Sequence, residues 1–236
     1  MKVTVINGNL RHGSTWHSAD AVIKEIGKLE EVSLSEFFLP RAMPHFCCGC
    51  FSCITKGEES CPHAEAVKPI LDSILEADLI VLTSPVYAMN VSAQMKALLD
   101  HLCFMWMSHR PNPLMFDKIG LTVSTTAGAG LGQSTKAMRD SLTFWGSKKV
   151  YSLKSPVSAM SWDSVKEGRK RSIEKSSTRL ARRIVGSYRK RERIANPFFR
   201  SFFFSLMRGM MRKNDWNLTD RNHWKANGWL NGAKPF

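Results

Sequence analysis

The sequence of 236 residues predicts an α/β fold: a doubly wound, five-stranded parallel sheet followed by a basic, mainly helical C-terminal extension. Strand-like runs alternate with helix-like patterns over the first 160 residues. These strand-like runs are continuously apolar, which is typical of strands buried on both faces. Residues 1–164 carry 15 basic and 15 acidic side chains, whereas residues 165–236 carry 19 and 5. This change in charge indicates a neutral core followed by a basic extension.

The first half of the chain predicts two strand–helix repeats. VTVING, residues 3–8, is rich in β-formers and ends at a glycine, and residues 15–28 follow it with apolar positions at helical spacing. VSLSEFFLP, residues 32–40, is the second expected strand. Residues 64–77 form a helical pattern, with an apolar stripe along one face made by Val67, Ile70, Leu71 and Ile74.

The second half continues the alternation. LIVLTSPVY, residues 79–87, predicts a buried strand, and residues 92–107 predict a helix. KIGLTVSTTAGAG, residues 118–130, predicts a strand that runs into a glycine-rich loop, followed by a helix over 134–145 and a last strand around VYSL near residue 150. Folds of this type bind ligands outside the carboxyl ends of the strands, at the switch point in strand order. The loops after the first, third and fourth strands are therefore the candidate site.

The loop after the first strand is GNLRHGST, residues 8–15. It matches neither the dinucleotide fingerprint G-x-G-x-x-G nor a P-loop. Its backbone N–H groups, the Arg11 cation and the hydroxyls of Ser14 and Thr15 could hold a terminal phosphate at a helix N-terminus. The alternative is an ordinary helix cap made by Ser14 or Thr15.

The other two loops are SPVYAMN, residues 84–90, and TTAGAG, residues 125–130. Pro85 stiffens the first of them, and Tyr87 offers a flat apolar face to a planar ring, unless it lies in the core. The small residues of TTAGAG let backbone amides approach a ligand closely, unless the loop is only a flexible connection.

Over residues 1–160 the sequence resembles the flavodoxin-like NAD(P)H-dependent FMN reductases. The resemblance rests on four stretches taken together: GNLRHGST, the C-x-x-C-x-x-C run from Cys47 to Cys53, ADLIVLTSPVYAMNVSAQMKALLD and TTAGAG. The resemblance is closest to the iron–sulfur flavoprotein branch. It implies noncovalent FMN, NAD(P)H as a co-substrate, and a homodimer or homotetramer with the flavin near a subunit interface. The phosphate would be held by Asn9, Arg11, Gly13, Ser14 and Thr15, and the isoalloxazine bordered by Ser84, Pro85, Val86, Tyr87 and Asn90, with Thr125, Thr126, Ala127 and Gly128 at its far edge.

Five of the six cysteines lie between residues 47 and 61. The spacing Cys47-x2-Cys50-x2-Cys53-x7-Cys61 lets four thiolates converge, which suits a [4Fe–4S] cluster. The iron–sulfur flavoproteins carry a compact motif of this form. Zinc on four thiolates is a rival, although structural zinc sites usually show two separated C-x-x-C pairs. Free thiols are the other rival. We assign no role to Cys48, and we expect Cys103 in the core.

These parts predict an FMN-dependent oxidoreductase that passes electrons between a one-electron carrier such as ferredoxin, the cluster and FMN. The cofactors carry the chemistry, so no catalytic side chain is assigned. A cluster-free NAD(P)H-dependent FMN or quinone reductase is the first alternative. A non-catalytic electron carrier or flavin-binding module is the second.

We expect two parts: an FMN-binding domain, 1–164, with the cysteine loop 47–61, and a segment, 165–236, that holds the last core helix and the basic, aromatic-rich extension. One long helix is expected over 163–195. The cationic, amphipathic stretch 197–213 could contact an anionic membrane surface, but packing on a partner subunit is favoured. The tryptophan-rich end is expected near the flavin or a dimer interface.

The sequence also favours some locations and partners over others. No window contains the run of about 18 apolar residues that crosses a bilayer. MKVTVINGN lacks the apolar core and cleavage site of a signal peptide. We therefore expect a cytoplasmic protein, in a compartment where clustered cysteines indicate metal or redox chemistry. No nucleic-acid-reading motif accompanies the basic charge, so no nucleic-acid partner is expected.

Overall fold

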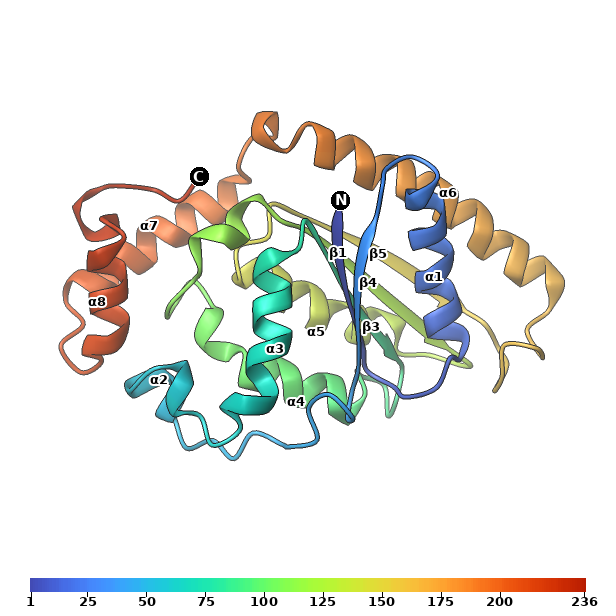
Figure 1. The fold of residues 1–236 in the computed structure, drawn as a ribbon, viewed down its shortest axis with the longest axis horizontal. Coiled ribbons are helices and arrows are strands. Elements are labelled where there is room, and N and C mark those ends of the chain that lie inside the picture. Colours follow the sequence, from blue (N-terminus) through green and yellow to red (C-terminus); the bar gives the residue numbers. More distant parts are fainter.

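The structure, a computed structural model, describes residues 1–236 and contains one sheet of five parallel strands in the order β2-β1-β3-β4-β5 (Figure 1). This is the strand order of the flavodoxin-like doubly wound folds, with a switch point between β1 and β3. The predicted α/β fold with five parallel strands is confirmed. The strands are β1 (Lys2–Asn7), β2 (Ser33–Phe38), β3 (Leu79–Pro85), β4 (Ile119–Thr126) and β5 (Lys149–Pro156).

Helices cover both faces of the sheet, as Figure 1 shows. One face packs against α1 (Ser14–Gly27) and α6 (Glu167–Arg189), and its core includes Val22, Ile26 and Ile184. The other face packs against α3 (Ala64–Glu76), α4 (Ala93–His101) and α5 (Leu131–Phe144), with a core that includes Ile70, Leu98 and Leu142. The short elements are α2 (Ser52–Thr55) and the 3₁₀ helices Glu58–Ser60, Cys103–Met105, Pro113–Asp117, Arg191–Arg193 and Trp229–Asn231.

Burial within the sheet follows strand position. All eight residues of β4 are buried, and so are the first six residues of β3. The edge strand β2 is largely exposed, and its Leu34 is 49% accessible. The continuous apolar runs therefore belong to the central strands, which have helices on both faces.

The helix expected over residues 163–195 is shorter at both ends. Residues 157–166 form a loop after β5, α6 begins at Glu167, and it ends at Arg189. The chain then turns through the 3₁₀ helix Arg191–Arg193, where the Arg191 guanidinium donates to a carboxylate oxygen of Asp78. This ion pair ties the turn to the start of β3, so the helical pattern does not continue to Asn196.

The C-terminal segment forms a second, smaller core around aromatic side chains. It contains α7 (Phe198–Arg212) and α8 (Leu218–Ala226), and buried Phe204 of α7 stacks on Trp224 of α8 with 4.6 Å between ring centroids. Phe116, which precedes β4, packs edge-on against Phe204 and so joins this cluster to the sheet domain. The opposite face of α7 exposes an apolar stripe made by Phe198, Phe202, Leu206 and Met210. None of the helices combines the length and apolar character needed to cross a membrane.

The aromatic cluster gives a stability prediction. Phe204→Ala should lower the free energy of unfolding by about 3 kcal/mol, because it removes a fully buried ring and leaves a cavity. Phe202→Ala is the matched control on the same helix, since Phe202 is 56% exposed, and it should change stability by less than about 0.5 kcal/mol. Chemical denaturation of the two variants measures the difference. Equal losses would show that the aromatic cluster does not hold the C-terminal segment in place.

Candidate functional site

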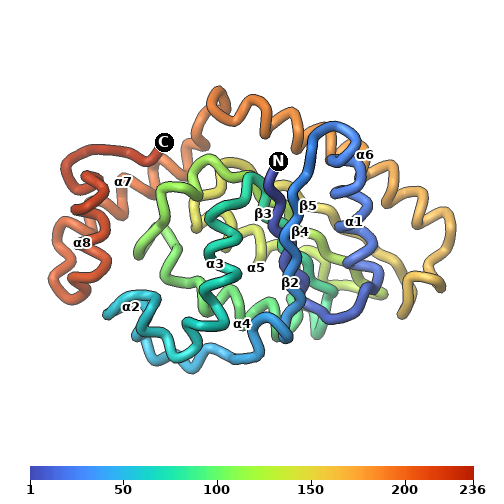
Figure 2. Tube along the Cα trace, viewed as in Figure 1, coloured from blue at the N-terminus to red at the C-terminus, as the bar shows by residue number.

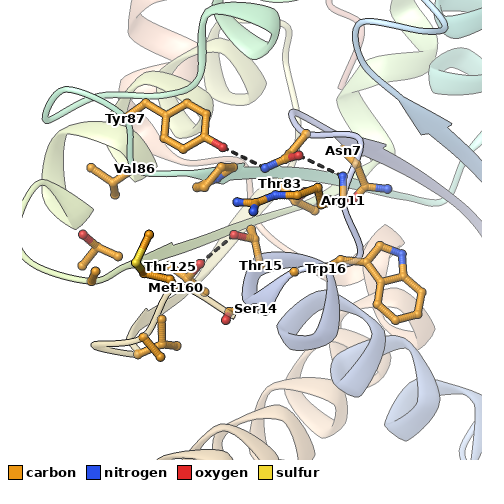
Figure 3. A pocket seen from close by; sticks show the side chains of 17 residues that line it. Asn7, Arg11, Ser14, Thr15, Trp16, Thr83, Val86, Tyr87, Thr125 and Met160 are labelled. Carbon is orange, nitrogen blue, oxygen red and sulfur yellow. Dashed lines mark hydrogen bonds between the residues drawn. The ribbon is translucent and has the colours of Figure 1, made fainter. Parts of the chain in front are cut away.

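A pocket of about 250 Å³ opens at the carboxyl ends of β1, β3 and β4, on the switch point of the sheet (Figure 3). The loops expected to form a site therefore do meet, because parallel strands end at one edge. Most of the predicted cofactor-binding residues line this pocket: Asn9, Arg11, Gly13, Ser14, Thr15, Pro85, Val86, Tyr87, Thr125, Thr126 and Ala127.

The N-terminus of α1 faces the pocket with its backbone donors free of side-chain caps. Gly13 occupies the cap position, and no side chain accepts a bond from the first turn. The alternative that Ser14 or Thr15 caps the helix is therefore not what the structure shows. Uncapped N–H groups at a helix N-terminus are suited to an anion, and Arg11 adds a cation among the lining residues. No aspartate or glutamate lines the pocket.

Hydrogen bonds connect the three loops around this space. The hydroxyls of Thr15 and Thr125 are 2.6 Å apart and join the first loop to the fourth-strand loop. The Asn9 amide nitrogen donates to the Tyr87 hydroxyl at 2.9 Å, and the Asn9 amide oxygen accepts from the Arg11 backbone N–H (Figure 3). The first loop begins at Gly8, where a Cβ atom would lie 2.7 Å from the Ser92 hydroxyl, so only glycine fits there.

Tyr87 is positioned by a tight turn. The backbones of Tyr87 and Asn90 exchange two hydrogen bonds of 2.9 Å, and Ala88 and Met89 between them have positive φ values of 45° and 66°. Tyr87 is 44% exposed, which excludes the alternative that it lies in the core. The turn holds its ring at the rim of the pocket.

Three predicted residues shape the loops without lining the pocket. The Ser84 hydroxyl accepts from the Ser92 backbone N–H, and the Asn90 side-chain oxygen accepts from its neighbour Val91. The Gly128 N–H donates to the Thr126 hydroxyl.

Sequence reasoning missed six lining residues. Asn7 ends β1 and is hydrogen-bonded at 2.9 Å to Thr83, which lies within β3. Trp16 lies in the first turn of α1. The others come from the loop after β5, which was not among the loops considered. Because β5 pairs in parallel with β4, the carboxyl end of β5 reaches the same edge of the sheet. A parallel fifth strand was therefore the signal that could have identified this loop as part of the site. These residues are Val157, Ala159 and Met160.

The cysteine loop places its thiols in one region. Cys47, Cys48 and Cys50 are exposed, and Cys53 and Cys61 are half-buried. Burial raises the pKa of the Cys61 thiol, and the nearby charges of Cys53, Cys50 and Cys47 add to the effect. Of the four predicted metal ligands, only Cys61 has its ligand atom grouped with those of two other residues of metal-binding types, and these are His63 and His101.

Cys103 takes part in this region as well. It is half-buried against the large core rather than fully buried in it, and Cys53 packs against the same core. The Cys103 thiol, with a further contribution from the Arg110 cation, lowers the pKa of Cys53 to about 6. The sixth cysteine thus contacts the loop that holds the other five.

Buried Arg110 fixes the end of the cysteine loop. Its guanidinium donates to the backbone oxygens of Cys53 and Ile54, to a carboxylate oxygen of Glu58 at 3.0 Å, and to Asp220 of α8 at 2.6 Å. Asp220 is fully buried. One cation therefore joins α2, the loop after α4 and the C-terminal segment.

The C-terminal segment packs on the cysteine loop rather than beside the pocket. The Thr219 hydroxyl donates to the Thr55 backbone oxygen at 2.6 Å, and Figure 2 shows α8 next to α2. Asp220 also accepts from His109 at 2.7 Å and from Asn217 at 2.8 Å. No residue after Met160 lines the pocket, so the tryptophan-rich end is not near the expected flavin position.

Comparison with known proteins agrees with this geometry. The family model described as NADPH-dependent FMN reductase matches residues 1–159. An iron–sulfur flavoprotein of Archaeoglobus fulgidus is 31% identical over 152 residues, which cover 62% of this chain and 64% of that protein. An iron–sulfur flavoprotein of Methanocaldococcus jannaschii is 36% identical over 143 residues, or 57% of this chain and 67% of that protein. The chain thus spans about two thirds of the length of these relatives.

Solved structures show the same fold at low sequence identity. A flavone reductase superposes with a TM-score of 0.63 at 15% identity, covering 84% of this chain and 66% of that one. An azoreductase of Bacillus anthracis gives 0.61 at 15% identity, covering 77% and 98%. With a family model that covers most of its length and a pocket at the switch point of a flavodoxin-like sheet, the chain belongs to the NADPH-dependent FMN reductase family.

Proposed function

We propose that the protein is an FMN-dependent oxidoreductase that holds FMN in the switch-point pocket and a [4Fe–4S] cluster in the cysteine loop. The observation that carries the proposal is the uncapped N-terminus of α1, which opens with Arg11 into a pocket free of carboxylates. Bound flavin would exchange one or two electrons and a cluster one electron, so the pair would link a one-electron carrier such as ferredoxin to a two-electron partner such as NAD(P)H.

The pocket residues fit the two ends of FMN. Arg11, Ser14 and Thr15 offer a cation and hydroxyl groups to the phosphate, together with the free N–H groups of the helix. Pro85 and Tyr87 would border the flat ring system, and Tyr87 is held in place by Asn9. The apolar side chains of the loop after β5 would exclude water from the remaining side.

The cysteine loop fits a sulfur-bound cluster in its donor set. Cys47, Cys50, Cys53 and Cys61 supply four thiols from one loop, in the compact spacing that suits a cluster. Arg110, which is itself paired with Asp220 and Glu58, donates to the Cys53 backbone oxygen and would hold this part of the loop in place around a cluster. The names of the curated relatives, iron–sulfur flavoproteins, support the same assignment.

The charge of the C-terminal segment supports an acidic electron carrier as partner. Residues 165–236 supply the whole net charge of +14, and a basic surface attracts acidic proteins over long range. A reducing cytoplasm would keep the exposed thiols available for the cluster.

The FMN site predicts a specific loss of affinity. Arg11→Ala should raise the Kd for FMN about tenfold, because a charge-assisted contact to phosphate is worth about 1.5 kcal/mol. Arg139→Ala removes an exposed cation from α5, outside the pocket, and should leave the Kd unchanged. Quenching of flavin fluorescence during titration measures both values. Equal Kd values for the two variants would place the phosphate elsewhere.

The cluster predicts a difference between adjacent cysteines. Cys47→Ser should abolish most of the bound iron in anaerobically purified protein, because it removes one of the four thiolate ligands. Cys48→Ser alters an equally exposed neighbour outside the motif and should retain the iron. Iron and acid-labile sulfide are measured per chain. Retention of iron by both variants, or loss by both, would contradict the assigned ligand set.

The exposed stripe of α7 supports a homo-oligomer. Phe198, Phe202, Leu206 and Met210 face outward, whereas the guanidinium groups of the same helix bond backbone oxygens of the chain itself. Three arginines of α7 are thus held by the chain itself rather than left free for lipid headgroups. An apolar stripe of this kind suits a second copy of the chain.

Sedimentation of a stripe variant tests the homo-oligomer. Phe202→Glu should convert the wild-type dimer or tetramer to monomers, because it puts a charge into an apolar interface. Leu114→Glu changes a residue of similar exposure on another surface and should leave the assembly intact. A wild-type monomer that co-sediments with anionic vesicles would instead assign the stripe to a membrane surface.

A further inference from the structure

Three side chains of types that can bind a metal ion meet beside the cysteine loop: Cys61, His63 and His101. Cys61 and His63 precede α3, and His101 lies at the end of α4. One ligand atom from each lies within 4.8 Å of the other two. The His63 Nδ1 and His101 Nε2 atoms are 2.9 Å apart, and the His63 backbone N–H contacts the Cys61 sulfur at 3.5 Å.

His101 is oriented as metal-binding histidines are. It is 3% exposed, and its Nδ1 lies 2.7 Å from the Ala97 backbone oxygen. That contact requires a proton on Nδ1, so in the neutral ring Nε2 carries a lone pair directed at His63. A backbone oxygen that fixes the remote ring nitrogen is the usual second contact of a histidine ligand. His45 stacks on His63 with 4.4 Å between ring centroids and steadies the second imidazole.

We propose that Cys61, His63 and His101 form a site for a single Zn²⁺ ion. One thiolate and two imidazoles are ligands that zinc prefers, and three protein ligands leave the fourth tetrahedral position for water. Sulfur and nitrogen donors exclude magnesium and calcium, which require oxygen ligands.

A cavity gives the ion a route from solvent. Cys61 and His101 line an open cavity of about 310 Å³. Acidic side chains outnumber basic ones around it, so the cavity attracts a cation rather than an anion. The acidic residues are Glu58, Glu59, Glu65 and Asp72, and the basic one is Lys68.

This zinc site and the proposed cluster share Cys61, so they cannot be filled together. Cys47, Cys50 and Cys53 belong to the cluster alone, and His63 and His101 belong to the zinc site alone. The zinc site therefore serves the chain in its cluster-free form, and it does not rest on the proposed function. A zinc ion there would also block assembly of the cluster at Cys61.

The test uses the full-length chain carrying Cys47→Ser, Cys50→Ser and Cys53→Ser, which cannot form the four-cysteine cluster. With reduced thiols, this protein should bind one equivalent of Zn²⁺ in competition with a chromophoric chelator. Co²⁺ in place of Zn²⁺ should give the absorption of a tetrahedral ion with a thiolate-to-metal charge-transfer band.

Further substitutions in this background identify the ligands. His101→Ala and His63→Ala should each weaken Zn²⁺ binding by about a hundredfold or more. Removing only the hydrogen-bond partner of a metal ligand already weakens binding by up to about a hundredfold, and these variants remove a ligand itself. His12→Ala and Cys48→Ser should bind as the parent does, since neither residue belongs to the site. His101 is buried, so His101→Ala could unfold the chain. His63 is only half-buried, and His63→Ala therefore tests the zinc site even in that case.

Two results would overturn the site. The first is absence of Zn²⁺ and Co²⁺ binding by the triple-serine chain. The second is binding that both histidine variants, folded as judged by circular dichroism, leave unchanged. Neither result bears on the cluster, because the iron content of the wild-type chain is measured separately.

Discussion

Parallel pairing of all five strands is the constraint from which the candidate site follows. It brings the loops after β1, β3, β4 and β5 to one edge, although they are separated by up to about 150 residues of sequence. The switch in strand order between β1 and β3 leaves a gap between their connections at that edge. The N-terminus of α1 opens into this gap, and the Thr15–Thr125 hydrogen bond closes the loops around it. The proposed binding of the phosphate and ring of FMN in this pocket would therefore follow from one topology.

A second link joins the cysteine loop to the C-terminal segment. The Arg110–Asp220 pair is buried, and removing one partner of such a pair typically costs about 3–5 kcal/mol because the other charge is left uncompensated. Arg110 also donates to Glu58 and to two backbone oxygens of α2, the helix that carries Cys53. The C-terminal segment, which the sequence presents as an appendage, thus contributes to the shape of the cysteine loop.

The sequence predicted what depends on local pattern and failed where contacts are distant. Apolar runs and helical stripes located the strands and most helices, since burial on a sheet face leaves a periodic trace. The loop after β5 has no motif of its own, so the sequence did not identify Met160 as a pocket residue. Its place in the pocket follows only from the topology of the sheet. Arg110 and Asp220 are 110 residues apart, and the residue types alone do not show that the two side chains pair. The His63–His101 contact joins the start of α3 to the end of α4. The spacing of the two residues in the sequence matches no known motif, so the contact could not be predicted.

The most direct test of the central claim is the absorption spectrum of the wild-type protein purified without oxygen, with flavin, iron and sulfide assayed on the same sample. We expect one FMN per chain and a broad iron–sulfur shoulder beneath the flavin bands, with about four irons and four sulfides per chain. Flavin bands without iron would contradict the cluster and leave a plain FMN reductase. A protein that binds no flavin when FMN is added would contradict the account as a whole.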